Sequence, residues 1–127
     1  MIRTKNRQII TDIPSPGTEE ILLNLEKYES RSMQGQLPIV WDRAKDFNIY
    51  DRHGNKWIDF TSTIFVTNVG HANSRVIAAM QAVMEKPLLH SYAYAHKLRS
   101  DYQRRLVEYA GGHFQKAFLL SAGTEAT

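Results

Sequence analysis

Apolar residues recur at helical spacing in three stretches of the chain. They predict helices over about 18–32, 73–86 and 95–110, since positions three and four apart share one face of a helix. Thr18, and either Asn73 or Ser74, stand where a side-chain oxygen can accept the first free amide N–H groups. The three stretches are therefore expected to be helices, and the apolar stripe of the second is expected to face a core.

Between the first two helices, the pattern changes to short runs of β-branched and aromatic residues. Segments 39–41, 47–51 and 56–60 predict strands, and the glycine and asparagine within 52–55 favour a hairpin turn. We expect a small antiparallel meander here. Its core is expected to contain five aromatic side chains, Trp41, Phe47, Tyr50, Trp57 and Phe60.

Further segments precede and follow this meander in the sequence. Residues 1–17 are mostly polar and rich in turn formers, which predicts an extended arm, whereas the apolar run Lys116–Leu120 predicts a buried strand. The expected organisation is an N-terminal arm and helix over 1–38, the meander over 39–70, and the start of a larger α/β domain over 71–127. The fold class is thus α/β, and we expect this last domain to be truncated at Thr127.

Composition adds limits on the function. The chain has 127 residues, 43% of them hydrophobic, and 16 basic against 13 acidic residues give a net charge of +3. Basic and acidic residues are mixed along the chain, so the charge does not favour a nucleic-acid surface. No run approaches the roughly 18 apolar residues of a membrane span. With no cysteine and no leader-like segment, we expect a cytoplasmic protein without a membrane partner.

Histidines raise the question of a metal site. No two of them stand at a spacing that would bring them to one helix face with a carboxylate between them. We therefore expect no metal. The five histidines are His53, His71, His90, His96 and His113.

The last residues carry the clearest chemical signal. Small and hydroxyl residues precede a predicted helix start, where free amide N–H groups and the helix dipole favour a phosphate. An ordinary capped helix fits the same pattern, and neither a Walker loop nor a dinucleotide fingerprint is present. Both interpretations stay open on local pattern alone. The residues are Ser121, Ala122, Gly123, Thr124 and Glu125.

Three segments together are typical of one family. They are the hairpin 51–60 (DRHGNKWIDF), the loop 66–71 (VTNVGH) and the turn 122–126 (AGTEA). In this order and spacing, the chain resembles the N-terminal part of class III aminotransferases, which are fold-type I enzymes that depend on pyridoxal 5'-phosphate. The resemblance implies that a homodimer would form, with active sites at the subunit interface.

The resemblance also implies site residues. The cofactor phosphate would be held by the backbone around Gly123 and Thr124, with Ser121 and Ala122 adjoining. Ile64 would line the substrate pocket, as would Tyr92. No catalytic residue lies in this stretch, because the lysine that binds the cofactor would follow Thr127.

Two residues depart from the family pattern. Ala122 stands where the phosphate turn usually has serine, which removes one hydroxyl donor unless Ser121 replaces it. Thr63 stands where a glycine often precedes the pocket residue. We expect the backbone beside Ile64 to differ for that reason.

The expected function of the full-length enzyme is transfer of an amino group from an ω-amino acid, such as 4-aminobutyrate, to a 2-oxo acid such as 2-oxoglutarate. Residues 1–127 alone are expected to be inactive. Alternatives on the same fold are an aminomutase, a racemase or a decarboxylating enzyme. Outside that class, the chain could be a non-catalytic phosphate-binding module or a structural dimerisation arm.

Overall fold

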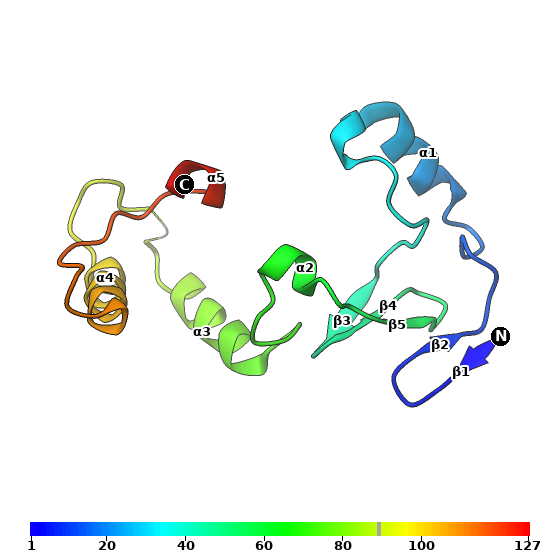
Figure 1. The fold of residues 1–127 in the computed structure, drawn as a ribbon, viewed down its shortest axis with the longest axis horizontal. Coiled ribbons are helices and arrows are strands. Elements are labelled where there is room, and N and C mark those ends of the chain that lie inside the picture. Colours follow the sequence, from blue (N-terminus) through cyan, green and yellow to red (C-terminus); the bar gives the residue numbers. More distant parts are fainter. Residues whose placement is uncertain (89) are drawn as a thin grey trace. The chain divides into compact units, whose positions relative to one another are not determined.

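The computed structural model describes residues 1–88 and 90–127, in two compact units, Met1–Ala82 and Val83–Thr127. Figure 1 shows the elements of each unit along the chain. No helix in the described residues is long and apolar enough to cross a membrane.

The first unit is built on a five-stranded sheet in which all neighbouring strands are antiparallel. The N-terminal arm was expected to be merely extended, but it folds back as a hairpin and adds two strands to the meander (Figure 1). In spatial order the strands are β1 (Ile2–Arg3), β2 (Gln8–Ile9), β5 (Lys56–Ile58), β4 (Asn48–Tyr50) and β3 (Arg43–Lys45).

The predicted meander is present, with one strand displaced. The expected strand at 39–41 is wrong, because pairing with β4 begins only at Arg43. Ile39 instead donates its amide to the Leu37 carbonyl at 2.7 Å, which is a local turn. The tight turn at Asp46, whose φ is +55°, sets the register, so the residues that directly precede it form the strand.

A buried polar network joins the N-terminal arm to the β4–β5 hairpin. Asn55 is fully buried, and its side-chain oxygen accepts from the amides of Ile10 and Thr11 at 2.7 and 3.2 Å. Its side-chain nitrogen donates to Ser15 and Asp51 at 3.1 and 2.7 Å. Each buried polar group is thus paired, which removes the cost of taking it out of water.

The expected aromatic core is wrong for the chain as described. Ile49, 4% exposed, is the one buried hydrophobic residue among residues 1–88 and 90–127, while Trp41 and Phe47 are half-exposed and Phe60 is largely exposed. The physical reason is the absence of a second layer: no helix packs on the sheet within the described parts of the chain.

Three predicted helices are present. They are α1 (Glu19–Tyr28), α3 (Ser74–Met84) and α4 (Lys97–Ala110). Asn73 caps α3 by accepting from the Arg75 amide at 3.0 Å. The hydroxyl of Thr18 does not cap α1, because it donates to the Ser15 carbonyl at 2.6 Å.

Two expectations for these helices are corrected. The first helix ends at Tyr28 rather than near Ser32, because Glu29 is extended and a short 3-10 helix, η1 (Arg31–Met33), follows. The apolar stripe of α3 was expected to face a core. Yet α1, α3 and α4 contain no buried residue, since no other element of the described chain packs on them.

The expected buried strand at Lys116–Leu120 is also wrong. The segment forms no ladder, and its link to α4 is a hydrogen bond from the Gln103 side chain to the Ala117 carbonyl at 3.1 Å. A strand needs a neighbour to pair its N–H and C=O groups, and the described residues of this unit supply none.

Candidate functional site

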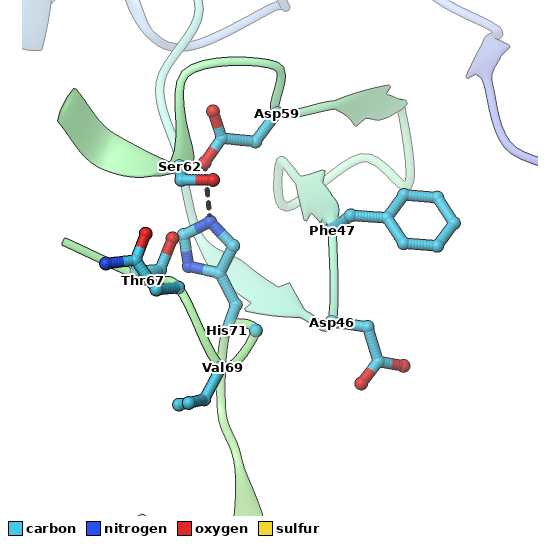
Figure 2. A pocket seen from close by; sticks show the side chains of 9 residues that line it. Asp46, Phe47, Asp59, Ser62, Thr67, Val69 and His71 are labelled. Carbon is cyan, nitrogen blue, oxygen red and sulfur yellow. Dashed lines mark hydrogen bonds and ion pairs between the residues drawn. The ribbon is translucent and has the colours of Figure 1, made fainter. Parts of the chain in front are cut away.

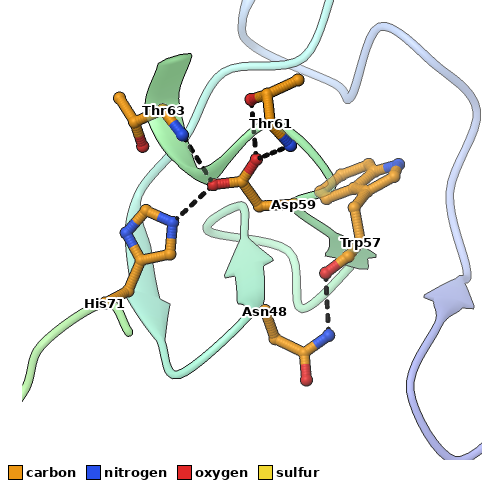
Figure 3. Close-up of polar contacts among 6 residues, drawn as sticks. All are labelled: Asn48, Trp57, Asp59, Thr61, Thr63 and His71. Atoms are coloured by element: carbon orange, nitrogen blue, oxygen red, sulfur yellow. Dashed lines mark hydrogen bonds and ion pairs between the residues drawn. The ribbon is translucent and has the colours of Figure 1, made fainter. Parts of the chain in front are cut away.

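The Asp59 carboxylate is the centre of the best-organised polar cluster in the first unit. It directly follows β5, and its Oδ1 accepts from the amide and the hydroxyl of Thr61 at 2.9 and 2.8 Å. Its Oδ2 accepts from the Thr63 amide at 3.1 Å and lies 2.7 Å from Nε2 of His71 (Figure 3). Four donors surround two oxygens, so the carboxylate is fully occupied.

The pair is shielded from water, since the side chains of Asp59 and His71 are 3% and 11% exposed. Burial tends to raise the pKa of the Asp59 carboxyl, but the hydrogen bonds from His71 and Thr61 outweigh it and lower the pKa to about 2. Asp59 is therefore a carboxylate across the physiological range. Its role is to accept hydrogen bonds, because a group with so low a pKa is a poor proton acceptor.

His71 is held by its own backbone. Its N–H and C=O form a two-way bridge with Asp46, in the β3–β4 turn, at 2.7 and 2.9 Å. This approach requires glycine at position 70, where a Cβ would lie 3.3 Å from the Asp46 Cα and φ is +88°. The edge of the Trp41 ring packs against the imidazole, with 6.2 Å between ring centroids. The imidazole is thereby aimed at Asp59.

The segment α2 (Ser62–Phe65), which Asp59 caps, has an unusual backbone. All four of its residues have φ between +49° and +65°, so this turn is left-handed. Left-handed helical geometry costs roughly 1–2 kcal/mol per residue for L-amino acids, and β-branched residues such as Thr63 and Ile64 adopt it least readily. The turn therefore depends on the contacts that hold it.

The usual glycine of the family pattern at position 63 fits this backbone. The φ of Thr63 is +53°, a region that glycine adopts without steric cost. Thr63 takes this angle while its amide is bound by Asp59. The expected difference in backbone beside Ile64 stays a prediction.

A shallow pocket of about 260 Å³ lies around this pair (Figure 2). Asp59, Ser62 and His71 line it, together with the β3–β4 turn. Ile64 does not line this pocket, and it is 77% exposed. The turn therefore presents Ile64 to the outside rather than to the interior of the unit.

Tyr92, the other predicted substrate residue, belongs to the second unit. It is 93% exposed with φ +44°, at the tip of a turn that precedes α4. The Arg99 guanidinium donates to the backbone carbonyls of Tyr92 and Tyr94, so α4 fixes the shape of this turn. Tyr92 is accessible to a ligand, and nothing in the described chain contacts its ring as a stacking partner.

The predicted phosphate turn also lies in the second unit. A helix start is present where expected, as the four-residue α5 (Gly123–Ala126). The Glu125 carboxylate turns back to accept from the amides of Ser121 and Ala122 at 2.9 and 3.3 Å. Within the described residues, no hydrogen bond uses the amides of Gly123 and Thr124.

The predicted site residues thus fall into two groups. Ile64 lies in the first unit, whereas Tyr92 and the turn from Ser121 to Thr124 lie in the second. Asp59 and His71 were not singled out as site residues from the sequence. The available signal was that each of them ends or nearly ends one of the recognised motifs, at 51–60 and 66–71.

Known proteins supply the context for these segments. The sequence pattern of the family described as Aminotransferase class-III matches residues 29–127. Acetylornithine aminotransferase of Methanocaldococcus jannaschii is 32% identical over 109 residues, which are 86% of this chain and 27% of that protein. The 4-aminobutyrate aminotransferase of Mycobacterium leprae is 36% identical over 78 residues, which are 61% of this chain and 18% of that protein.

Solved structures agree with the fold. The crystal structure of acetylornithine aminotransferase from Elizabethkingia anophelis is similar, with a TM-score of 0.75 and 26% sequence identity. The matched region is 86% of this chain and 28% of that one. The chain spans about a quarter of the curated relatives that it matches, 27% of the length of the Methanocaldococcus protein and 24% of a Lactococcus lactis one. With a family pattern that covers residues 29–127, the chain belongs to the class-III aminotransferases.

Proposed function

We propose that this chain is part of a pyridoxal-phosphate-dependent aminotransferase that moves an amino group from an ω-amino donor to a 2-oxo acid. The observation that carries the proposal is the family match over residues 29–127. The same interval holds every motif discussed above. Amino transfer itself is a property of the whole enzyme, of which residues 1–127 contribute the segments described here.

The turn from Ser121 to Thr124 is the proposed binding place of the cofactor phosphate. Two features fit a phosphate. The amides of Gly123 and Thr124 are unused in the described chain, and a Cβ built on Gly123 would meet no atom within 4 Å apart from its chain neighbours and the backbone of its own helix. A phosphate oxygen can therefore approach this backbone closely. The hydroxyls of Ser121 and Thr124 supply further donors, which compensates for alanine at position 122.

Pyridoxal phosphate, when bound, supplies the carbonyl carbon and the electron-withdrawing ring that amino transfer requires. The contribution of this chain is positioning. The phosphate turn anchors one end of the cofactor, while Ile64 and Tyr92 are proposed to border the space that the amino donor occupies. Both side chains are exposed and uncharged, so they favour the aliphatic part of a donor rather than its carboxylate.

The donor class follows from the relatives and from Ile64. The similar proteins are named for acetylornithine, ornithine and 4-aminobutyrate, which all have an amino group at the end of an aliphatic chain. A neutral Ile64 suits such a chain, and we favour 4-aminobutyrate as donor and 2-oxoglutarate as acceptor. We also propose that the enzyme is a cytoplasmic homodimer, like the family that it resembles.

The proposal is tested on the full-length gene product, purified with pyridoxal phosphate. Addition of 4-aminobutyrate is expected to replace the long-wavelength absorbance band with a shorter-wavelength one, and 2-oxoglutarate is expected to restore it with formation of glutamate. Ornithine and acetylornithine, assayed in parallel, decide the donor. A product that binds pyridoxal phosphate but shows no spectral change with any of the three donors contradicts the proposal.

Product analysis separates the alternatives on the same cofactor. A racemase or an aminomutase returns an isomer of the donor, and a decarboxylating enzyme releases CO₂, whereas a transaminase forms glutamate in step with loss of donor. Absence of any bound cofactor would leave the phosphate-binding module or the structural arm as the remaining interpretations.

A further inference from the structure

The left-handed turn Ser62–Phe65 is the feature of the first unit that its own residues explain least well. It contains two β-branched residues and no glycine, yet φ is positive at all four positions. Three backbone hydrogen bonds close it, from the amides of Phe65, Val66 and Thr67 to the carbonyls of Thr61 and Ser62. These bonds satisfy the polar backbone, but they do not select the left-handed form over the right-handed one.

The contacts that select this form come from outside the turn. The Asp59 carboxylate binds the amides of Thr61 and Thr63 with different oxygens, at 2.9 and 3.1 Å (Figure 3). The carboxylate therefore lies across the start of the turn and fixes the orientation of both amides. His71 occupies the remaining position on Oδ2, which stops the carboxylate from rotating away.

The backbones of His71 and Asp59 are both fixed by the β3–β4 turn. The His71 backbone is bridged to Asp46, and the Asp59 amide donates to the Phe47 carbonyl at 2.8 Å. Both ends of the Asp59–His71 contact are therefore anchored on the same β3–β4 turn. Figure 2 shows the imidazole of His71 pointing toward the Asp59 carboxylate, with Phe47 and Asp46 on the neighbouring turn.

We propose that Asp59 and His71 are positioning residues that hold the turn Ser62–Phe65 in its left-handed form, and so set the direction in which Ile64 faces the amino donor. The inference rests on the proposed function for its link to the donor. Neither residue is assigned a chemical step, because the carboxylate has its four hydrogen-bond partners already. Threonine at position 63 makes the turn depend on the hydrogen bonds of Asp59, since glycine would adopt the same φ without them.

The test uses Asp59→Asn in the full-length enzyme, because asparagine keeps the size of the side chain and replaces one acceptor oxygen with a donor. Amide hydrogen exchange of the peptide that covers residues 61–67 is expected to become faster. The kcat/KM for the amino donor is expected to fall roughly 10- to 100-fold, as for other misplaced substrate contacts. Affinity for pyridoxal phosphate is expected to stay unchanged, because the phosphate turn is a separate segment.

A second variant separates positioning from a general structural role. Thr63→Gly in the Asp59→Asn background removes the steric cost at one of the four positions with positive φ, so a measurable part of the lost kcat/KM is expected to return. A His71→Gln variant, which keeps a side-chain donor, is expected to lose less than His71→Leu. The matched control is Asp42→Asn, the same change at an exposed carboxylate that pairs with Arg43, and it is expected to change none of these quantities.

The outcomes are distinct. Unchanged exchange in Asp59→Asn, or a loss of kcat/KM that Thr63→Gly does not even partly reverse, overturns the positioning role. If the wild-type enzyme transaminates none of the donors, the proposed function fails and the link to the donor fails with it. The exchange measurement, which needs no turnover, then still decides whether Asp59 holds the turn.

Discussion

Hydrogen bonds from a few polar side chains join separate segments of the unit Met1–Ala82. Asn55 and Asp51 are buried, and five hydrogen bonds connect their side chains to Ile10, Thr11 and Ser15 of the arm. The Asp59 carboxylate likewise binds the left-handed turn, through Thr61 and Thr63. Removing one partner from such a network leaves others buried and unpaired, at a cost of roughly 1–3 kcal/mol per group.

At the scale of one residue, Gly123 is the sharpest probe of the phosphate turn. A Gly123→Asp substitution places a carboxylate where the phosphate is proposed to bind, and repulsion is expected to weaken pyridoxal-phosphate affinity roughly ten-fold or more. Equilibrium dialysis of the full-length enzyme measures this. Gly112→Asp is the matched control, since Gly112 also has open space around it and no left-handed φ. Equal affinities in the two variants would contradict the assignment.

At the scale of elements, the β3–β4 turn joins three segments that lie apart in sequence. Asp46 pairs with His71, Phe47 accepts from Asp59, and Asp59 caps the turn Ser62–Phe65. The sheet, the loop 66–71 and the left-handed turn therefore form one connected unit. This connection accounts for the order of a region that has little hydrophobic burial.

The same connection predicts a dependence on pH. The pKa of Asp59 in the folded chain is about 2, below its ordinary value of 3.8. A lowered pKa means that its contribution to stability is complete above about pH 4 and is lost as pH falls toward 2. Tryptophan fluorescence of the full-length enzyme, which reports on Trp41 beside His71, is expected to change in that range. In Asp59→Asn this change should be smaller; an identical titration would exclude Asp59 as its source.

At the scale of the whole molecule, large apolar side chains are exposed in both units, among them Leu23, Leu37, Tyr94 and Phe118. Exposed apolar surface of this extent marks regions that other parts of a protein or a partner subunit cover. The chain spans 27% of the length of the Methanocaldococcus relative. In the proposed full-length homodimer, further residues and a second subunit are expected to cover this surface.

The homodimer has a direct test. Light scattering of the full-length enzyme during size exclusion is expected to give twice the mass of one polypeptide over the range of concentrations used in the assay. Burial of the apolar surface between subunits is the physical reason. A single species with the mass of one polypeptide, active at the same concentration, would contradict it.

Local signals in the sequence were sufficient for three helices, for two of the four predicted strands and for the family. Asn73 and Pro87 delimit a helix by interactions with their own neighbours, and the motifs at 51–60, 66–71 and 122–126 are contiguous. The expected strand at Lys116–Leu120 failed because a strand exists only when another one pairs with it.

The sequence by itself determined the family, the fold class and the helical segments, because caps, breakers and short motifs act between residues close in the chain. Only the tertiary structure decided which distant groups meet. It paired Asp59 with His71, tied Asn55 to Ile10 and Thr11 across more than 40 residues, and turned Ser62–Phe65 left-handed. Such contacts depend on how the backbone folds back to bring distant residues together, and local sequence patterns do not specify that path.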